Sequence, residues 1–166
     1  MSDQSEHSLD QIRRDYTRGR LEGSSLPDDP IVLLGRWLTE ARETSHPDPT
    51  AMNLSTVNTR GQPSSRMVLL KDIHEGNLVF FTNYRSRKGR EMKERPEVAA
   101  HFYWPELERQ VRIEGTAAPL PEALSDAYWR SRPAESNIGA WASPQSQVIP
   151  DRNALETAFE HYRRKF

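Results

Sequence analysis

The sequence predicts an α+β fold, mainly antiparallel β, in which a small barrel of strands is surrounded by helices. Two observations support this prediction. Apolar residues follow strand-like patterns in five segments joined by short turns, which favours antiparallel pairing along the chain. Helical periodicity occurs before, between and after these segments, so helices are expected to cover the barrel. The predicted strands are 51–57, 65–73, 78–82, 98–104 and 107–117, and the first three are expected to form a meander.

The first predicted helix has a clear start signal. Asp29 can cap a helix whose first residue is Pro30, because proline suits the first helical position. This helix is expected to end near Thr44, with its apolar residues on one face. Ser86 is a second capping residue, directly after a predicted strand. Further helices are predicted at 86–95, 121–130, 138–141 and 153–164.

Length and composition limit the functional classes. The 166 residues are enough for one domain, predicted over residues 21–166 behind a flexible N-terminal segment, residues 1–20. A formal net charge of −1 gives no general attraction to nucleic acid or membranes. The absence of cysteine excludes disulfides, thiolate catalysis and cysteine metal sites. No apolar run approaches the roughly 20 residues of a membrane span, so a cytoplasmic location is expected.

Two groups of cations lie on neighbouring predicted elements. Arg66 and Lys71 flank the apolar run of the second strand, and Arg87 and Lys88 follow the capping Ser86. Guanidinium and ammonium groups supply donors to phosphate oxygens, so these groups predict a pocket for a phosphorylated ligand. Solvated cations at strand ends and on a capped surface helix are an equally good interpretation of position alone.

Hydroxyl, amide and guanidinium groups further along the chain could complete such a pocket. Tyr128, Arg132 and Ser136 are spaced four apart and together could bind a phosphate, although a helix terminus explains them too. Gln110 and the Gln145 loop are typical of exposed strand and turn positions. The sequence has no glycine-rich phosphate loop, no His pair with metal spacing and no G-x-S-x-G elbow. Any reactive group is therefore expected to come with a cofactor, and neither a metal nor a catalytic side chain is assigned.

Six motifs follow one another in a fixed order. They are Arg-x-Val-Leu-Leu-Lys at 66–71, Phe-Phe-Thr-Asn at 80–83, Ser-Arg-Lys at 86–88, Glu-Arg-Gln-Val at 108–111, Tyr-x-x-x-Arg-Pro at 128–133 and Ser-x-Ile-Gly-Ala-Trp-Ala-Ser-x-Gln-Ser at 136–146. Together they resemble the pyridoxine/pyridoxamine 5′-phosphate oxidase family, over about Ile12 to Phe166. The resemblance implies an FMN-binding split β-barrel that forms a homodimer with flavin at the subunit interface.

The resemblance also implies site residues and a reaction. The implied FMN-binding residues are Arg66, Met67, Val68, Leu69, Leu70, Lys71, Phe81, Thr82, Arg87, Lys88, Gln110, Gln145 and Ser146. The implied substrate-binding residues are Arg13, Arg14, Asp15, Tyr16, Lys71, Tyr128, Arg132 and Ser136. The implied reaction oxidises pyridoxamine or pyridoxine 5′-phosphate with dioxygen, giving pyridoxal 5′-phosphate and hydrogen peroxide.

The chain departs from the family pattern in two places. Phe81 stands where relatives often have tyrosine. Family members are expected to continue for roughly 50 residues beyond Phe166, with final strands that touch flavin and substrate, so impaired FMN binding and turnover are expected here. Two other functions fit the same motifs. One is a related split-barrel flavin oxidoreductase with another substrate, such as a reductase or a phenazine-type oxidase, and the other is a non-catalytic module that binds FMN or pyridoxal phosphate.

Overall fold

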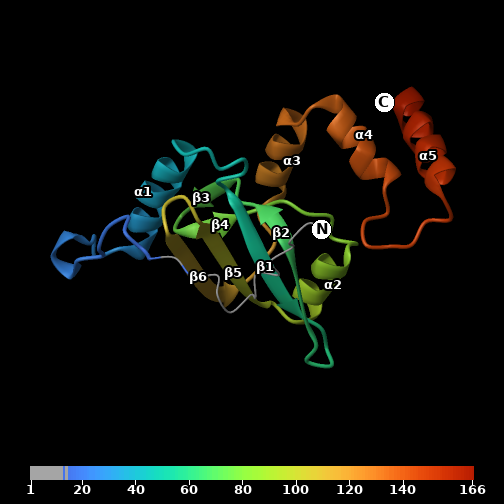
Figure 1. Cartoon of the computed structure of the whole chain (residues 1–166). Helices are drawn as coiled ribbons and strands as arrows, with labels where there is room; N and C mark the ends of the chain where they lie inside the picture. Colours follow the sequence, from blue (N-terminus) through green and yellow to red (C-terminus); the bar gives the residue numbers. More distant parts are fainter. Residues whose placement is uncertain (1–12, 14) are drawn as a thin grey trace, which may run out of the picture. The chain divides into compact units, whose positions relative to one another are not determined.

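Across residue 13 and residues 15–166, which the computed structural model describes, four strands form the main sheet in the order β2, β1, β5, β6 (Figure 1). β1 (Ala51–Val57) pairs antiparallel with β2 (Pro63–Leu69) and with β5 (Glu97–Trp104), and β6 (Arg109–Thr116) is the outer neighbour of β5. The predicted α+β class with an antiparallel sheet is confirmed.

β1 has the residue bounds that its alternating pattern predicted. Met52, Leu54 and Thr56 point to one face and are at most 1% exposed, as expected for a period of two. In the pairing with β2, Leu54 lies opposite Arg66 and Thr56 lies opposite Ser64. This register brings the buried hydroxyl of Thr56, the half-buried hydroxyl of Ser64 and the long cation of Arg66 onto the same side of the sheet.

The predicted strand 65–73 is wrong as a continuous element, and so is the three-stranded meander. β2 ends at Leu69, and a separate two-stranded sheet follows, made of β3 (Asp72–His74) and β4 (Asn77–Val79). The chain changes hydrogen-bond partner at this point. The Leu70 N–H donates to the Thr50 carbonyl at 2.9 Å, whereas the Lys71 N–H donates to the Val79 carbonyl at 2.8 Å. Lys71 therefore lies at the junction of the two sheets.

Helices occur where helical periodicity predicted them. Asp29 caps the first through a 2.8 Å bond from the Ile31 N–H, with Pro30 at the first helical position, and Ser86 caps the second through the Gly89 N–H at 3.2 Å. The predicted piece at 138–141 is longer in the structure. The helices are α1 (Pro30–Arg42), α2 (Arg87–Glu94), α3 (Glu122–Ser131), α4 (Ala134–Ala142) and α5 (Arg152–Lys165), with a short 3-10 helix, η2 (Gly23–Ser25).

The chain consists of two units. One comprises the described residues up to Pro49 together with Tyr103–Gln110, and the other comprises Thr50–Phe102 and Val111–Phe166. In the first unit the Trp104 indole donates to the Pro49 carbonyl at 2.8 Å, and the buried face of α1 consists of Leu34, Leu38 and Ala41. The core of the second unit includes Met52, Leu54, Leu70, Val79, Ala100 and Phe102. A domain boundary at residue 20 stays a prediction.

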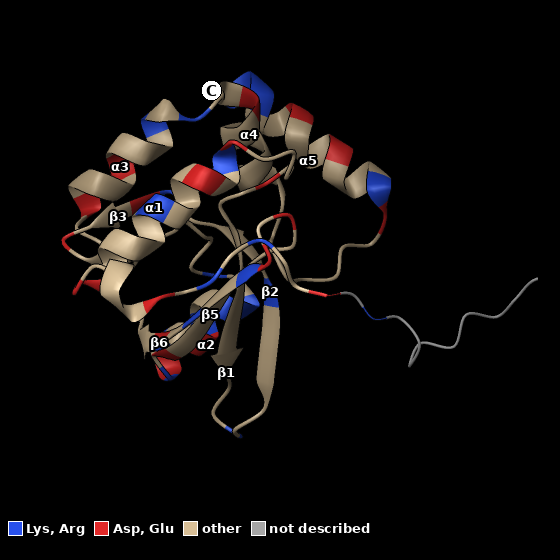
Figure 2. Ribbon diagram, turned by 60° about the vertical axis from the view of Figure 1, so that its left-hand side comes forward, with Lys and Arg blue, Asp and Glu red and all other residues tan. Residues whose placement is uncertain are grey.

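Basic and acidic residues are interspersed along the helices and strands (Figure 2). This distribution agrees with a formal net charge of −1. Within the described residues, no helix has both the length and the apolar character needed to cross a membrane.

Candidate functional site

A buried carboxylate, Glu91 of α2, is the centre of a polar cluster between α2 and the β1–β2 pair. Its Oε2 accepts hydrogen bonds from Thr56 Oγ1 and, at 2.9 Å, from Ser64 Oγ, and lies 3.4 Å from Arg66 Nη2. Its Oε1 accepts a hydrogen bond from Arg87 Nε at 2.8 Å. We call these five residues the Glu91 cluster. Figure 1 shows α2 next to β1 and β2.

Arg66 is held on the inner side of β2 by several acceptors. Its Nη1 donates to the Leu54 carbonyl at 3.0 Å and to Thr56 Oγ1 at 2.7 Å, and its Nη2 donates to Ser64 Oγ at 2.7 Å. Burial lowers the pKa of Arg66, and the charge of Glu91 opposes that effect. A guanidinium with this many fixed partners has one orientation, unlike a solvated cation at a strand end.

The surroundings of Glu91 keep it ionised. Burial alone would raise the pKa of this carboxyl, because the charged form loses its hydration. Hydrogen bonds from Thr56, Arg87 and Ser64, together with the charge of Arg87, outweigh burial and lower the pKa of Glu91 to about 2. The cluster therefore contains one fixed negative charge with a guanidinium on each of its two oxygens.

Sequence reasoning missed Glu91, Thr56 and Ser64. One local signal was present, because Arg87 and Glu91 are four residues apart and so share a helix face. The hydrogen bonds of Thr56 and Ser64 to Glu91 depend on the register between β1 and β2, which no local pattern specifies.

Lys88 is a buried ammonium whose hydrogen-bond partners are neutral. Its side chain donates to Gln145 Oε1 at 2.9 Å and to Ser86 Oγ at 3.4 Å. Lys88 is 8% exposed, and burial followed by repulsion from Arg66 lowers its pKa. No ion pair within the described part of the chain includes Lys88. The bond to Gln145 brings together two sequence-predicted cofactor residues that are 57 positions apart.

Two further features lie in or near the segment that leads into α2: a buried hydroxyl, on Thr82, and a tight backbone contact, at Gly89. Thr82 Oγ1 is buried and has no hydrogen-bond partner among the described residues. Gly89 lies so close to the preceding turn that an added Cβ would be 2.5 Å from the Tyr84 carbonyl oxygen. Ser146, next to Gln145, has a φ of 65°, a left-handed conformation that is uncommon for serine. A buried hydroxyl without a partner is a hydrogen-bonding position open to a ligand.

The other predicted cofactor residues of β2 point in alternating directions. Met67 and Leu69 are 61% and 38% exposed, whereas Val68 is half-buried. Leu70, just after the strand, is buried. Any contact of Met67 or Leu69 with a ligand must therefore occur on the outer face of the strand or through the backbone.

A cavity of about 280 Å³ brings together Lys71, Phe81 and Tyr128. The rings of Phe81 and Tyr128 are stacked in parallel, with centroids 3.7 Å apart and an angle of 4° between their planes. The remaining lining residues are Asp72, His74, Val79, Leu120 and Leu124. We call this space the Tyr128 cavity. It joins the junction between the two sheets to α3, with one ammonium and one phenol at its wall.

Arg132 and Ser136 are joined to each other at the start of α4. Arg132 is the C-terminal cap of α3, so it lies just past the helix that carries Tyr128. Its Nη2 donates to the Ser136 carbonyl at 3.0 Å, and its guanidinium carbon is 5.3 Å from the centroid of the Trp129 ring. The neighbouring Asn137 Oδ1 is buried without a partner in the described chain.

The remaining predicted site residues belong to the first unit or lie outside the described residues. Gln110 is an exposed residue of β6. Arg13, Asp15 and Tyr16 are exposed, and Arg14 lies outside the described residues. Within this unit, the segment after Tyr16 is attached to a turn, because the Thr17 and Arg18 N–H groups donate to Glu108 Oε2 at 2.6 and 2.9 Å.

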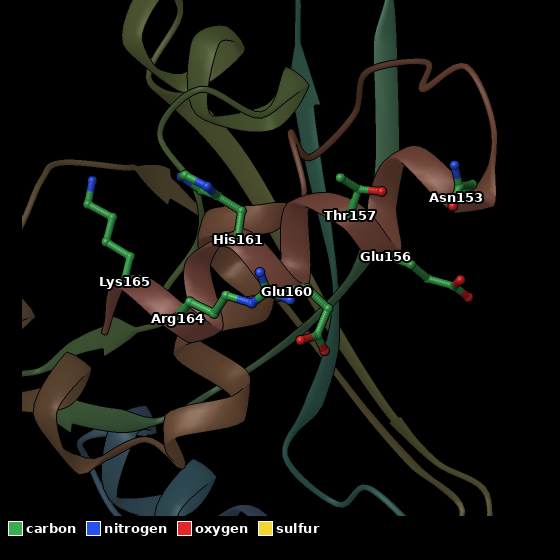
Figure 3. Close-up of a pocket in the computed structure, with 7 residues that line it drawn as sticks. All are labelled: Asn153, Glu156, Thr157, Glu160, His161, Arg164 and Lys165. Atoms are coloured by element: carbon green, nitrogen blue, oxygen red, sulfur yellow. The ribbon is translucent and has the colours of Figure 1, made fainter.

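A larger hollow of about 670 Å³ lies along one face of α5. Figure 3 shows its lining side chains, all from that single helix: Asn153, Glu156, Thr157, Glu160, His161, Arg164 and Lys165. None of them was predicted from the sequence to bind a ligand. Among the described residues, no group of three or more His, Asp or Glu side chains is arranged to hold a metal ion.

Comparison with protein families and named proteins gives consistent matches. Residues 38–166 match the sequence model of the family described as pyridoxamine 5′-phosphate oxidase. A Neisseria gonorrhoeae protein named pyridoxine/pyridoxamine 5′-phosphate oxidase is 51% identical over 147 residues, which cover 89% of this chain and 70% of that protein. A protein of the same name from Cupriavidus pinatubonensis is 48% identical over 158 residues, covering 95% of this chain and 74% of that protein.

Two solved structures have the same fold. PhzG from Burkholderia lata, in complex with tetrahydrophenazine-1-carboxylic acid, is 34% identical with a TM-score of 0.79, covering 84% of this chain and 69% of that one. A pyridoxamine 5′-phosphate oxidase-related FMN-binding protein from Nostoc punctiforme has a TM-score of 0.60 at 21% identity, covering 75% and 69%. The predicted split β-barrel fold is confirmed by these likenesses.

Proposed function

The chain belongs to the pyridoxamine 5′-phosphate oxidase family, and we propose that it is an FMN-dependent oxidase of pyridoxamine or pyridoxine 5′-phosphate. The alcohol substrate and dioxygen would give pyridoxal 5′-phosphate and hydrogen peroxide. The amine substrate would consume one water as well and release ammonia. The observation that carries the proposal is Lys88, a buried ammonium that feels the charge of Arg66 and, among the described residues, donates to the neutral groups of Ser86 and Gln145.

The residues of the second unit fit a flavin phosphate. Arg66, Arg87 and Lys88 would bind its oxygens, because charge-assisted hydrogen bonds from fixed donors are the strong ones. Thr82 has a buried hydroxyl without a partner, which a polar edge of the cofactor could satisfy. Gln145 is held by Lys88 at 2.9 Å and would contact the same ligand. When bound, FMN would supply the two-electron acceptor that no side chain of this chain provides.

The substrate would be held by its phosphate, away from the carbon that reacts. Lys71 and Tyr128 line one cavity, and Arg132 and Ser136 are joined at the end of α3. We propose that these four residues bind the phosphate and so orient the rest of the substrate. Binding energy from a remote group that fixes orientation lowers the entropic part of the barrier. No side chain is assigned as a general acid or base.

Anaerobic spectroscopy tests the proposal directly. The purified chain is loaded with FMN, and pyridoxamine 5′-phosphate is added under nitrogen. The proposal predicts that the visible flavin absorption is bleached and that air restores it with release of hydrogen peroxide. A chain that binds FMN but keeps its colour under these conditions would contradict the proposed oxidation of pyridoxamine 5′-phosphate.

A second function has one observation in its favour. The likeness to PhzG, with a TM-score of 0.79, supports a split-barrel oxidase that acts on a phenazine precursor. Such a substrate offers a carboxylate instead of a phosphate ester. The higher identity to the proteins named pyridoxine/pyridoxamine 5′-phosphate oxidase favours the first function. Bleaching by tetrahydrophenazine-1-carboxylic acid, but not by pyridoxamine 5′-phosphate, would reverse this order.

The assembly around the site also belongs to this proposal. We propose a homodimer with FMN at the subunit interface, dioxygen as the second substrate, and a cytoplasmic location. Light scattering with and without FMN tests the dimer, because a cofactor bound at an interface stabilises the assembled form by mass action.

A further inference from the structure

We propose that Glu91 is a positioning residue for the binding of the flavin phosphate. It fixes the two guanidinium groups, of Arg66 and Arg87, that bind that phosphate. This inference rests on the proposed function, because it takes Arg66 and Arg87 as ligands of FMN. It assigns a role to a carboxylate that carries the same sign of charge as the ligand and would not itself touch it.

The first argument is geometrical. Each oxygen of Glu91 serves a different guanidinium, Oε2 facing Arg66 at 3.4 Å and Oε1 accepting from Arg87 at 2.8 Å. Arg66 comes from β2, whereas Arg87 is the first residue of α2. One carboxylate therefore connects the strand and the helix that carry the two cations, and sets the relative position of the cations.

The second argument is the order of exposure. The side chain of Glu91 is 6% exposed, that of Arg66 is 21% exposed and that of Arg87 is 51% exposed. The carboxylate is thus shielded, while both arginine side chains are partly exposed. A ligand approaching from solvent would meet the cations before the carboxylate, so Glu91 can orient them without occupying the binding position.

The third argument is charge. Arg66, Arg87 and Lys88 carry three positive charges, and Glu91 carries one negative charge, which leaves two positive charges. A phosphate monoester carries about −1.5 to −2 charges at neutral pH. The two arginines and the carboxylate of the Glu91 cluster, taken together with the neighbouring Lys88, therefore match the charge of a flavin phosphate.

The inference and simple charge counting predict opposite changes in FMN affinity when Glu91 loses its charge. Replacing Glu91 by glutamine removes a negative charge, so electrostatics without positioning predicts tighter binding of a phosphate. Positioning predicts weaker binding, because Arg66 and Arg87 lose the charged acceptor that fixes them. The two outcomes differ in direction.

The experiment compares FMN with riboflavin, which is the same flavin without the phosphate. Quenching of flavin fluorescence gives both affinities for the wild type, Glu91→Gln and Glu94→Gln. Glu94 is an exposed residue of the same helix, so Glu94→Gln has the same charge change without the contacts. We expect Glu91→Gln to weaken FMN binding about tenfold or more, equivalent to about 1.4 kcal/mol, with riboflavin affinity unchanged and Glu94→Gln like the wild type.

Several results would overturn the inference. Unchanged or tighter FMN binding by Glu91→Gln would do so, and so would an equal loss of FMN and riboflavin, which is the signature of a merely structural role. A wild-type chain that does not bind FMN would overturn the proposed function, and this inference with it.

A second variant covers the case in which Glu91→Gln does not fold. Glu91→Asp keeps the charge but is shorter by one methylene, so from the same backbone position its oxygens would lie farther from both guanidinium groups. We expect it to weaken FMN binding selectively as well, by about threefold or more. FMN affinity equal to that of the wild type in a folded Glu91→Asp chain, as judged by circular dichroism, would contradict positioning.

Discussion

The Glu91 cluster and the Tyr128 cavity hold their cations in different ways. In the Glu91 cluster, Arg66 has three acceptors besides the carboxylate, and Glu91 itself is almost fully buried. At the Tyr128 cavity, Lys71 is exposed, and Tyr128 is positioned by ring stacking on Phe81. Internal hydrogen bonds fix the donors of the Glu91 cluster, whereas at the Tyr128 cavity the ammonium is exposed and the phenol is held by ring packing.

This difference agrees with a division of work between the two proposed phosphate-binding regions. Donors that are already oriented lose little freedom when a ligand binds, which suits a cofactor that stays bound through many turnovers. Donors at an open cavity suit a substrate that enters and a product that leaves. The predictions below test this division, beginning with the largest expected effect.

Acid should destabilise the chain through the Glu91 cluster, because protonation removes the negative charge that Thr56, Ser64 and the two arginines contact. The pKa of Glu91 is lowered from 4.5 to about 2, so its contribution to folding is present above pH 4.5 and is lost as the pH falls toward about 2. That difference corresponds to about 3 kcal/mol of unfolding free energy. Urea unfolding of the wild type and Glu91→Gln between pH 5 and about 2 measures it. A gap between the two proteins that stays constant over this range would contradict the assignment.

Gly89→Ala should destabilise the chain by about 2 kcal/mol, because a Cβ would overlap the Tyr84 and Asn83 carbonyl oxygens at 2.5 and 2.7 Å. Gly139→Ala in α4 is the matched control. The nearest atom to its Cβ would be 4.0 Å away, on Phe159, so alanine should stabilise α4 by up to about 1 kcal/mol. Urea unfolding at neutral pH gives both values. Equal effects of the two changes would mean that the packing at Gly89 is less tight than described.

Arg132→Ala should raise the KM for pyridoxamine 5′-phosphate about tenfold, because one charged donor to the substrate phosphate is lost. FMN affinity should be unchanged. Steady-state peroxide formation and an FMN titration measure the two effects. The control is Arg130→Ala, which removes an exposed cation of α3 that forms an ion pair with Asp126 on the same helix. A similar loss from both variants would point to general charge instead of a phosphate contact.

Tyr128→Phe should have the smallest effect of the four. It removes the hydroxyl and keeps the ring that stacks on Phe81, so the free energy of unfolding should change by less than about 0.5 kcal/mol. Loss of the hydroxyl, one of several proposed donors to the substrate phosphate, should raise the substrate KM about threefold or more. If KM does not change while Tyr128→Ala lowers stability, Tyr128 acts only through its ring.

Short-range sequence patterns predicted one strand and the starts of two helices correctly. The period of two gave β1, and the capping residues Asp29 and Ser86 gave the starts of two helices. The break after Leu69 was missed because an apolar run has the same pattern whether the chain stays paired with one strand or switches to another. Only the hydrogen bonds of Leu70 and Lys71 reveal that change.

The sequence likewise predicted only those site residues that belong to short motifs. The motifs selected Lys88 and Gln145, and the structure joins them at 2.9 Å, although their contact with flavin stays a prediction. Glu91 was not selected, because an acidic residue on a short charged helix looks like a solvated surface group. Its burial follows from the position of α2 beside β1 and from the register that places Thr56 opposite Ser64. Such tertiary contacts are not encoded in any short segment.

An FMN titration of two variants tests the separation of the two regions most directly. Lys88→Met removes a buried ammonium from the neighbourhood of the Glu91 cluster, and Arg132→Ala removes a cation beyond the end of α3. We predict that Lys88→Met binds FMN at least about tenfold more weakly than the wild type, while Arg132→Ala binds it with wild-type affinity. Equal weakening in both variants, or weakening in Arg132→Ala alone, would contradict two separate phosphate-binding regions.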